Sequence, residues 1–289
     1  TLAFNSIANV GGGASALGAP TTAANGTIAL AGGATLQYTG SGHSSNRVIN
    51  LTSSGGTIDA SGSGTLTLSG GVTGAASNLI LTGSGNGVES GVIGTTTGTL
   101  TKNGTGTWTL SGANTYTGAT TINGGTLVAA NAAALGIAAA GTAVNAGATL
   151  DLSGRTTFAE SIALNNATLA WSGGDPTLTG GVALTGSNVV HGAAGTLTLG
   201  GVVSGSGGFN STGAGTLVAA GNNTYAGTTQ ISGGALRVTN ANGLGATSGG
   251  TSVGSSGRLI IDGVAIGAEA VTLNGPGLFG AGAITSNGN

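Results

Sequence analysis

Residues 107–136 read TWTLSGANTYTGATTINGGTLVAANAAALG, and residues 216–245 read TLVAAGNNTYAGTTQISGGALRVTNANGLG. The two stretches align without a gap, and 15 of their 30 positions are identical. Tyr116 matches Tyr225, and Leu135 matches Leu244 at the same offset. A repeat at a fixed offset is typical of chains built from many similar stacked units. The fold therefore has to be one that can repeat along the chain.

The repeat extends beyond these two stretches. Glu160 corresponds to Glu269 in the same register, and a more divergent copy lies near the beginning, where Gly33–Leu36 resembles Gly147–Leu150. We divide the chain into super-repeats of approximately 1–98, 99–207 and 208–289, all within one continuous segment, 1–289. Because the first super-repeat opens in mid-unit and no Met occurs, we expect the segment to belong to a longer repetitive polypeptide.

A shorter period lies inside each copy. Apolar runs recur mostly every six to ten residues, and within them Leu or Trp alternates with Thr, as in Thr65–Leu68, Thr107–Leu110 and Thr196–Leu199. Alternation with period two puts the apolar side chains on one face and Thr on the other, which indicates half-buried strands. Dipeptides such as Asn103–Gly104 and Asn123–Gly124 separate the runs and supply the positive φ that tight turns need.

Strands this short, joined by glycine turns, predict a parallel β-solenoid. Three apolar runs make one coil of about 20 to 25 residues, which is within the range of known solenoid repeats. The whole chain then forms about a dozen coils, stacked roughly 4.8 Å apart. The Ala-rich stretch 132–140 contains Gly136 and is too short to be a stable helix by itself. The expected fold class is therefore all-β, with three short strands per coil.

The composition excludes several classes of protein. Glycine accounts for 63 of the 289 residues, but without a G-X-Y period and with only three Pro the chain is not collagen. A hydrophobic fraction of 39% with 4% charged residues is also unlike a disordered chain. No run approaches the roughly 20 apolar residues of a membrane-spanning helix, so we expect no membrane insertion of this segment. The absence of Cys excludes a disulfide scaffold and thiolate metal sites.

The basic residues argue against a nucleic-acid partner. The five basic residues are isolated from one another in the sequence, so they cannot neutralise a row of phosphates. They are Arg47, Lys102, Arg155, Arg237 and Arg258.

Residues 104–127, GTGTWTLSGANTYTGATTINGGTL, resemble the passenger-associated transport repeat of bacterial autotransporters, also called the autotransporter-associated β-strand repeat. Residues 213–236 are a second, looser match, which keeps Asn223–Tyr225 and Gly233–Leu236 but has Ala219–Gly221 in place of Leu-Ser-Gly. The resemblance implies a right-handed parallel β-helix exported to the surface of a Gram-negative cell, extracellular or at the outer surface. The C-terminal translocator barrel of such proteins is absent from this sequence.

We expect no catalytic, cofactor-binding or metal-binding residue. Enzymes that cleave carbohydrate on a β-helix need carboxylates that converge on one face. One acidic pair, Asp151 and Glu160, is separated by enough chain to lie on different sides of one coil, and Asp151 corresponds to Ile260 in the next copy. We therefore interpret Asp151 as a solvated charge and the shared Glu160 and Glu269 as one structural contact. The other acids are Asp59, Glu89, Asp175 and Asp262.

Other site motifs are also missing. His43 and His191 lie in unrelated surroundings, and Ser is too common in this chain for a neighbouring Ser to indicate a triad. Gly55–Asp59 lacks the repeated glycines of a calcium-binding β-roll, and no Gly-Lys-Ser/Thr of a P-loop occurs.

Two surface features leave alternatives open. Thr-x-Thr recurs at 65–67, 99–101, 107–109, 115–117, 177–179 and 196–198, and registered Thr arrays on flat solenoids occur in ice-binding proteins, although these spacings are irregular. Aromatic side chains stack on sugars, but Trp108 and Tyr116 lie in the repeated motif, where a core role is expected. Tyr38, Trp171 and Tyr225 are the remaining Trp and Tyr residues.

The sequence thus indicates a structural or adhesive β-solenoid segment of a surface-displayed or secreted autotransporter-like protein. An outer surface with few charges does little to repel copies of itself, so we expect self-association into fibres, end to end or laterally. Host, biofilm or matrix surfaces are further partners to consider. We expect the chain not to be an enzyme. The alternatives are a glycan-binding or glycan-cleaving β-helix and an ice-binding Thr array.

Overall fold

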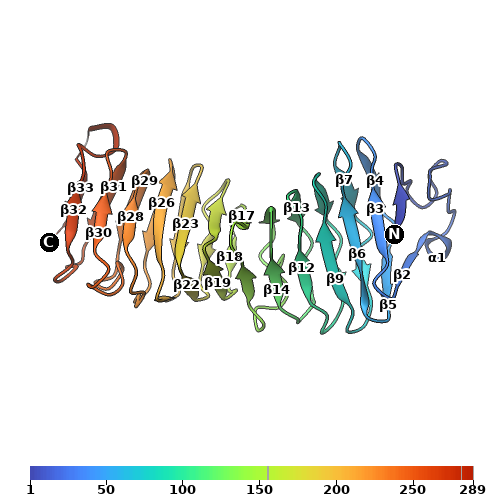
Figure 1. Ribbon diagram of the computed structural model, residues 1–289, viewed down its shortest axis with the longest axis horizontal. Coiled ribbons are helices and arrows are strands. Elements are labelled where there is room, and N and C mark those ends of the chain that lie inside the picture. Colours follow the sequence, from blue (N-terminus) through green and yellow to red (C-terminus); the bar gives the residue numbers. More distant parts are fainter. Residues whose placement is uncertain (155, 281, 289) are drawn as a thin grey trace. The chain divides into compact units, whose positions relative to one another are not determined.

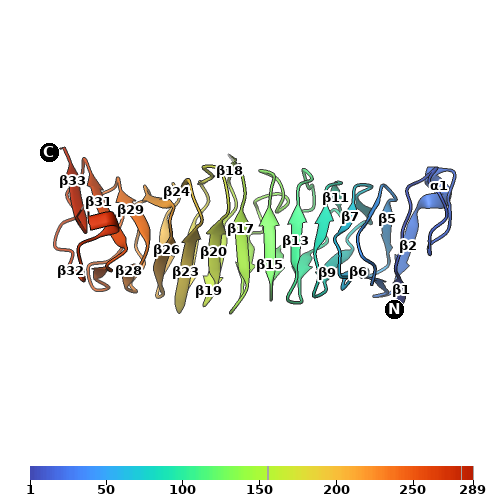
Figure 2. The same cartoon turned by 90° about the horizontal axis from the view of Figure 1, so that it is seen from above.

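The computed structural model describes residues 1–154, 156–280 and 282–288, and the chain is an all-β parallel solenoid. It has about 12 coils, about three strands per coil and almost no helix. Two compact units are present, Thr1–Thr142 and Ala143–Asn289, which we call unit 1 and unit 2 and describe separately. Arg155 lies outside the described residues. In Figure 1 the strands of each unit follow one another in parallel ranks, and Figure 2 shows the same ranks from above.

Unit 1 contains three parallel sheets. The first comprises β1 (Leu2–Phe4), β3 (Thr35–Tyr38), β6 (Gly55–Ala60), β9 (Asn78–Thr82), β12 (Leu100–Lys102) and β14 (Thr120–Ile122). The second comprises β4 (His43–Ser45), β7 (Leu66–Leu68), β10 (Gly87–Glu89), β13 (Thr107–Leu110) and β15 (Thr126–Ala129). The third is shorter and comprises β2 (Ile28–Ala31), β5 (Ile49–Thr52), β8 (Val72–Thr73) and β11 (Ile93–Gly94).

Unit 2 also contains three parallel sheets, after β16 (Thr142–Val144), which spans the boundary. The first comprises β19 (Ile162–Asn165), β22 (Val182–Thr185) and β25 (Val203–Gly205). The second comprises β17 (Thr149–Leu152), β20 (Thr168–Trp171), β23 (Ser187–Gly192), β26 (Gly208–Gly213), β28 (Thr229–Ile231), β30 (Thr251–Val253) and β32 (Val271–Leu273). The third comprises β18 (Thr157–Phe158), β21 (Thr177–Leu178), β24 (Thr196–Leu199), β27 (Thr216–Ala219), β29 (Gly234–Val238), β31 (Gly257–Asp262) and β33 (Ile284–Asn287).

The strand register gives the coil length. Each strand pairs with a strand one coil away, not with its neighbour in sequence, so that Trp108 faces Leu127 and Leu36 faces Ile58. Near the end of unit 2, Leu259 faces Ile284. The predicted coil length and the three short strands per coil are therefore confirmed. Right-handed winding and the super-repeat boundaries stay predictions.

The core is the inside of the coils. Along β13 the side chains alternate, with Trp108 and Leu110 fully buried and the two Thr half-buried, as the period of two predicts. Gly87, one coil away, faces Trp108, and a Cβ there would lie 2.5 Å from the indole ring. The wide indole ring therefore requires a residue without a side chain at position 87. The indole Nε1 donates to the Thr82 carbonyl at 2.9 Å.

The structure departs from the predicted strands at several places. Residues 111–119 form no strand, although the apolar run at Tyr116 predicted one. A four-residue helix, α1 (Ala23–Gly26), lies in the long connection before β2, where the Thr22 hydroxyl accepts a hydrogen bond from the amide of Asn25. A short 3₁₀ turn, η1, covers Leu278–Gly280. Among the described residues, no helix has the length and hydropathy needed to span a membrane.

Candidate functional site

The repeated motif occupies the same kind of position in each unit. Its first copy begins in β13 and ends in β15, and its second copy begins in β27 and ends in β29. Between the first two strands of the motif, each copy has a stretch without strand structure, 111–119 and 220–228. We call these two stretches, each containing the sequence Asn-Thr-Tyr, the NTY segments.

Each NTY segment continues the stack where a sheet ends. In unit 1 the third sheet stops at β11, and the amide of Thr115 then donates to the Ile93 carbonyl at 3.0 Å. In unit 2 the amide of Thr224 donates to the Val203 carbonyl of β25 at 2.8 Å. Every buried backbone group needs a partner, so the segment has to satisfy the strand that it covers.

A buried asparagine supplies the missing bonds. The Asn114 side chain accepts a hydrogen bond from the Ile93 amide at 2.9 Å and donates to the Ala134 carbonyl at 2.6 Å. It thus joins the coil before it to the coil after it. Asn223 does the same in unit 2, accepting from the Val203 amide at 2.8 Å and donating to the Gly243 carbonyl at 2.8 Å. The two side chains are 3% and 4% exposed.

A buried tyrosine follows each asparagine. The hydroxyls of Tyr116 and Thr120 are 2.7 Å apart, and those of Tyr225 and Thr229 are 2.6 Å apart. Burial raises the pKa of Tyr225, and the charge of Glu269 adds to the increase, against the bond to Thr229. The Tyr225 phenol therefore acts as a neutral hydrogen-bonding group of the core.

The loop after the motif is shaped by the tyrosine. Gly136 has a φ of +83°, and a Cβ there would lie 2.6 Å from the Tyr116 carbonyl oxygen and 2.8 Å from its ring. Gly245 has a φ of +80° and is placed in the same way against Tyr225. The recurrence of Leu-Gly at the same distance after each tyrosine thus has a steric cause.

Lys102 and Glu89 are ionisable side chains that lie inside unit 1. Lys102 is fully buried, and its Nζ donates to the carbonyls of Asn103, Gly104 and Gly124 at 2.8, 3.2 and 3.0 Å. Burial lowers the pKa of Lys102 to about 8. Because Gly124 belongs to the following coil, the ammonium group crosslinks two coils through their turns.

Glu89 is another buried ionisable group. Burial raises its pKa to about 8, against the opposing effect of hydrogen bonds from the Gly91 and Gly71 backbone. The Gly91 amide donates to Oε1 at 2.9 Å, while Oε2 has no hydrogen-bond partner among the described residues. The side chain is therefore a protonated, neutral carboxyl group at neutral pH.

Sequence reasoning missed both roles, although the signal was present. Glu89 is in register with Leu68 and Leu110, and Lys102 is in register with Leu81 and Ile122. Period-two alternation alone places both on the inward face. The inward placement was not predicted because Glu and Lys side chains are seldom fully buried.

Three of the acids named from the sequence, Asp151, Glu160 and Glu269, lie in unit 2. Asp151, which we expected to be solvated, is only 9% exposed, and its Oδ1 accepts from the Ser172 amide at 2.9 Å. Glu160 is 4% exposed. Glu269 accepts from the Thr251 hydroxyl at 2.8 Å, which is a structural contact. Among the described residues, no three His, Cys, Asp or Glu side chains group in a way that could hold a metal ion.

The histidines and aromatics have structural neighbours. His43 Nδ1 lies 2.9 Å from the Tyr38 hydroxyl, and His191 Nδ1 lies 3.0 Å from the Thr212 hydroxyl. Neither contact includes a carboxylate. The expected core role of Trp108 and Tyr116 is confirmed, and the other Trp and Tyr side chains, Tyr38, Trp171 and Tyr225, are buried as well. None of these five rings is exposed, so none is accessible for stacking on a sugar.

Threonines line up on one face of unit 1. Thr35, Thr57, Thr101 and Thr121 share one register on the sheet of β3, β6, β12 and β14, with Ile80 of β9 between them. We call these five residues the Thr row. The adjacent row contains Gln37, whose Nε2 donates to Asp59 Oδ2 at 2.9 Å. The face therefore has one row of Thr and not the paired rows that the ice-binding alternative requires.

The passenger-associated-transport-repeat family matches the chain at residues 100–129 and again at residues 211–238. At these two places the chain is similar to passenger-associated transport repeats. These matches enclose both NTY segments, with Lys102 in the first, and the solenoid fold is consistent with an autotransporter passenger repeat. No curated protein and no solved structure matches the chain.

Within each transport repeat, the matched residues serve the stacking of coils. Asn114 and Asn223 bridge coils, Tyr116 and Tyr225 fill the interior, and the paired glycines make the turns. The two repeats and the fold together support an autotransporter passenger segment, and passengers of this kind imply a surface or secreted protein.

Proposed function

We propose that the chain is a structural and adhesive segment of an autotransporter-like passenger, displayed at the bacterial outer surface or secreted, which associates with copies of itself. The observation that carries the proposal is the Thr row. It gives unit 1 a row along which the outward side chains of successive coils, four Thr and one Ile, are uncharged. Such a face offers flat contact area with little charge repulsion between copies.

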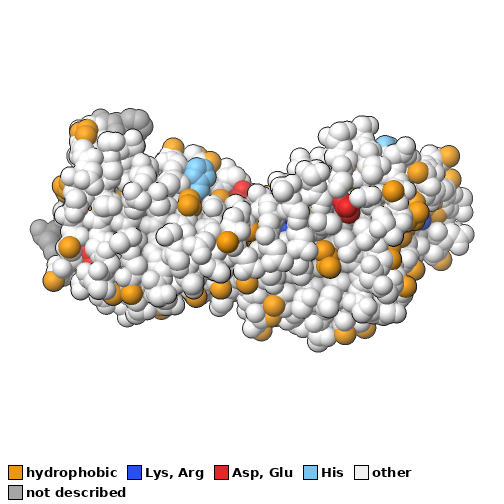
Figure 3. Space-filling view, in the orientation of Figure 1, with side chains coloured by type: hydrophobic (Ala, Val, Ile, Leu, Met, Phe, Trp, Pro, Cys, Tyr) orange, Lys and Arg blue, Asp and Glu red, His pale blue; other side chains and the backbone are white. Residues whose placement is uncertain are grey.

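The low charge of the rest of the surface supports the same role. Only 12 of the 289 residues are Asp, Glu, Lys or Arg, and several of these are buried, namely Arg47, Glu89, Lys102, Asp151 and Glu160. Figure 3 shows few charged atoms on one face of the molecule. Mutual repulsion, which keeps many soluble proteins apart, is therefore weak in this chain.

Sedimentation velocity over a wide range of protein concentration tests self-association. We expect larger species to grow with concentration, and Thr57→Lys with Thr101→Lys to abolish them by placing two charges on the Thr row. Thr107→Lys, on the second sheet of unit 1, is the matched control and should associate normally. A chain that stays monomeric at high concentration contradicts the proposal.

The geometry of the contact and the adhesive role need their own measurements. Electron microscopy distinguishes lateral sheets from end-to-end filaments, the two modes of association that we propose. Retention of the purified chain on biofilm matrix or host-cell surfaces tests adhesion. If the Thr row is the adhesive face, the double lysine variant loses retention together with self-association.

A further inference from the structure

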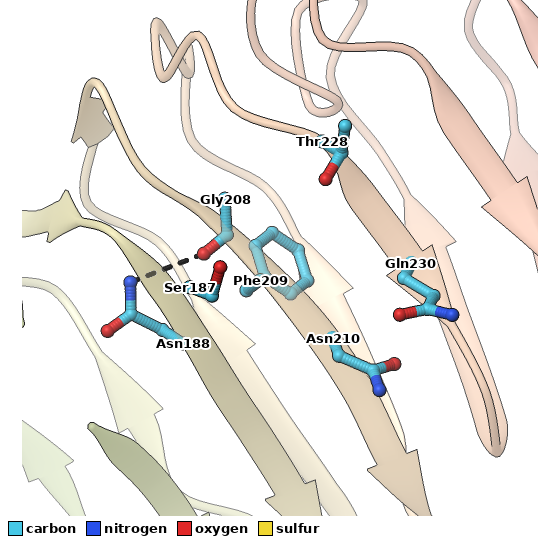
Figure 4. A pocket seen from close by; sticks show the side chains of 7 residues that line it. All are labelled: Ser187, Asn188, Gly208, Phe209, Asn210, Thr228 and Gln230. Carbon is cyan, nitrogen blue, oxygen red and sulfur yellow. Dashed lines mark hydrogen bonds between the residues drawn. The ribbon is translucent and has the colours of Figure 1, made fainter. Parts of the chain in front are cut away.

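A groove crosses the outer side of unit 2. Two hollows of about 100 and 200 Å³ adjoin there, and both are lined by Thr228. The first lies over β23, β26 and β28, and the second lies over β28, β30 and β32. Figure 4 shows the first hollow, with the amides of Asn210 and Gln230 on neighbouring strands. Because the hollows follow one another from strand to strand, the groove runs across the coils.

A row of polar side chains, one on each of four successive coils, runs along this groove. Asn210 is in register with Gln230, Gln230 with Ser252, and Ser252 with Thr272. All four alternate with core residues and face outward, half-buried or exposed. Parallel strands lie roughly 4.8 Å apart, so the row presents a hydrogen-bonding group at that interval.

The groups of the groove have unused hydrogen-bonding capacity. Asn210 Oδ1 is buried and has no partner among the described residues. The side chains of Thr228, Gln230, Ser252 and Thr272 likewise form no hydrogen bond with any residue that the structure describes. Asn188, at the edge of the first hollow, differs, because its amide bonds to Ala167, Thr185 and Gly208. An unsatisfied buried oxygen costs free energy that a ligand donor would recover.

The lining of both hollows is uncharged. One acid, Glu269, contacts the lining, because its Oε1 accepts a hydrogen bond from the hydroxyl of the lining residue Thr251. A carboxylate there repels an anionic ligand, and no basic side chain lines the groove to offset it. The groove is therefore suited to a ligand with many neutral donors and acceptors.

We propose that this groove binds a neutral, unbranched polysaccharide. Hydroxyl groups of a sugar act both as donors and as acceptors, as the amides and hydroxyls of the groove require. The interval between coils, roughly 4.8 Å, is close to the length of one sugar unit in an extended chain. The groove therefore offers successive sugars one hydrogen-bonding side chain from each of the successive coils. It lies in unit 2 and does not depend on association through the Thr row of unit 1.

Calorimetric titration with neutral linear hexasaccharides tests the proposal. Cellohexaose, laminarihexaose and maltohexaose are the neutral probes, and a hexameric oligogalacturonate is the anionic one. We expect at least one neutral probe to bind with a Kd of about 1 mM or lower, and the anionic probe to bind at least tenfold more weakly. No binding by any neutral probe in this range, or equal binding of the anionic probe, overturns it.

Variants locate the binding site. Asn210→Ala combined with Gln230→Ala should weaken binding about tenfold or more, since two neutral hydrogen-bonding groups are lost. Thr228→Trp should abolish it by filling the point where the hollows meet. Thr198→Ala, an outward change on β24 of the same unit, is the matched control and should bind normally. Binding that is the same in all three variants overturns the assignment to this groove, and circular dichroism verifies that each variant is folded.

Discussion

Asn114 holds three successive coils together with one side chain. Removing it leaves the Ile93 amide and the Ala134 carbonyl without their partner inside the protein. Each such buried group costs about 1–3 kcal/mol. We predict that Asn114→Ala lowers the free energy of unfolding by roughly 2–4 kcal/mol in urea titrations. Asn103→Ala, whose side chain bonds to Asn123 at the surface, should cost less than about 1 kcal/mol. Equal losses in the two variants would contradict the bridging role.

Glu89 makes stability depend on pH. The folded protein keeps the proton of Glu89 up to about pH 8, whereas the ordinary pKa is 4.5, so unfolding releases a proton between these values. The free energy of unfolding then falls as the pH rises from about 4.5 to about 8, by an amount on the order of a few kcal/mol. We predict that Glu89→Gln removes most of this slope in urea titrations at fixed pH. A slope that the substitution leaves unchanged would assign the pH dependence to other groups.

Lys102 produces a slope of opposite sign at higher pH. Its pKa is about 8 in the folded protein and ordinarily 10.5, so the unfolded chain binds the additional proton between these values. Stability therefore rises with pH in this window. We predict that Lys102→Met flattens the rise, whatever it does to stability at neutral pH. The same titrations, extended to pH 10.5, provide the measurement, and a rise that persists in Lys102→Met refutes the assignment.

The loop after each NTY segment depends on its glycine for space as well as for backbone conformation. Gly33 has a φ of +75° and nothing within 4 Å of an added Cβ, whereas a Cβ on Gly136 meets Tyr116. Gly33→Ala therefore reports the cost of the backbone conformation alone, about 1–2 kcal/mol. We predict that Gly136→Ala costs about 1–3 kcal/mol more, because the tyrosine has to move. Thermal unfolding of the two variants compares them, and equal costs would show that the ring yields freely.

The predictability of the elements follows from how locally each is determined. Alternation of Thr with Leu or Trp places β13 and β24 correctly, because the inward and outward faces of a strand are set by the strand itself. The strand expected at Tyr116 is wrong for a non-local reason. There the Asn114 side chain takes the place of a backbone carbonyl toward Ile93, so the segment is buried without being extended. Its two partners lie on the coils before and after it, and no local pattern records them.

The candidate site and the groove also contain features that a local sequence pattern predicts and features that it does not. The sequence identifies the motif that contains Asn114 and Tyr116, and it predicts a core position for Tyr116 but not for Asn114. Asn210 and Gln230 lie on successive coils and belong to no shared motif, so only the register of β26 and β28 brings them together. Thr35 and Thr57 likewise belong to no Thr-x-Thr pair, although they stand side by side.

Coils of a solenoid contact mainly their nearest neighbours, which confines the effect of a mutation. In such proteins stability is approximately a sum over repeats and the interfaces between them. We predict that hydrogen exchange in Asn223→Ala increases most in the coils that contain Val203, Asn223 and Gly243. Exchange of the β2 and β5 amides should remain as in the unchanged protein. A uniform increase over the chain would indicate a single cooperative unit.

The reach of the asparagine bridge also sets an order of events for a chain that becomes available gradually from one end. The bridge of Asn114 begins at Ile93 and ends at Ala134, so its two hydrogen bonds cannot both form until the whole span between them is free to fold. Before that moment, the coil behind Asn114 is held by one bond of the pair. Once the span is complete, the second hydrogen bond forms and the Asn114 side chain joins both coil interfaces. Complete release of this side chain then requires both hydrogen bonds to break.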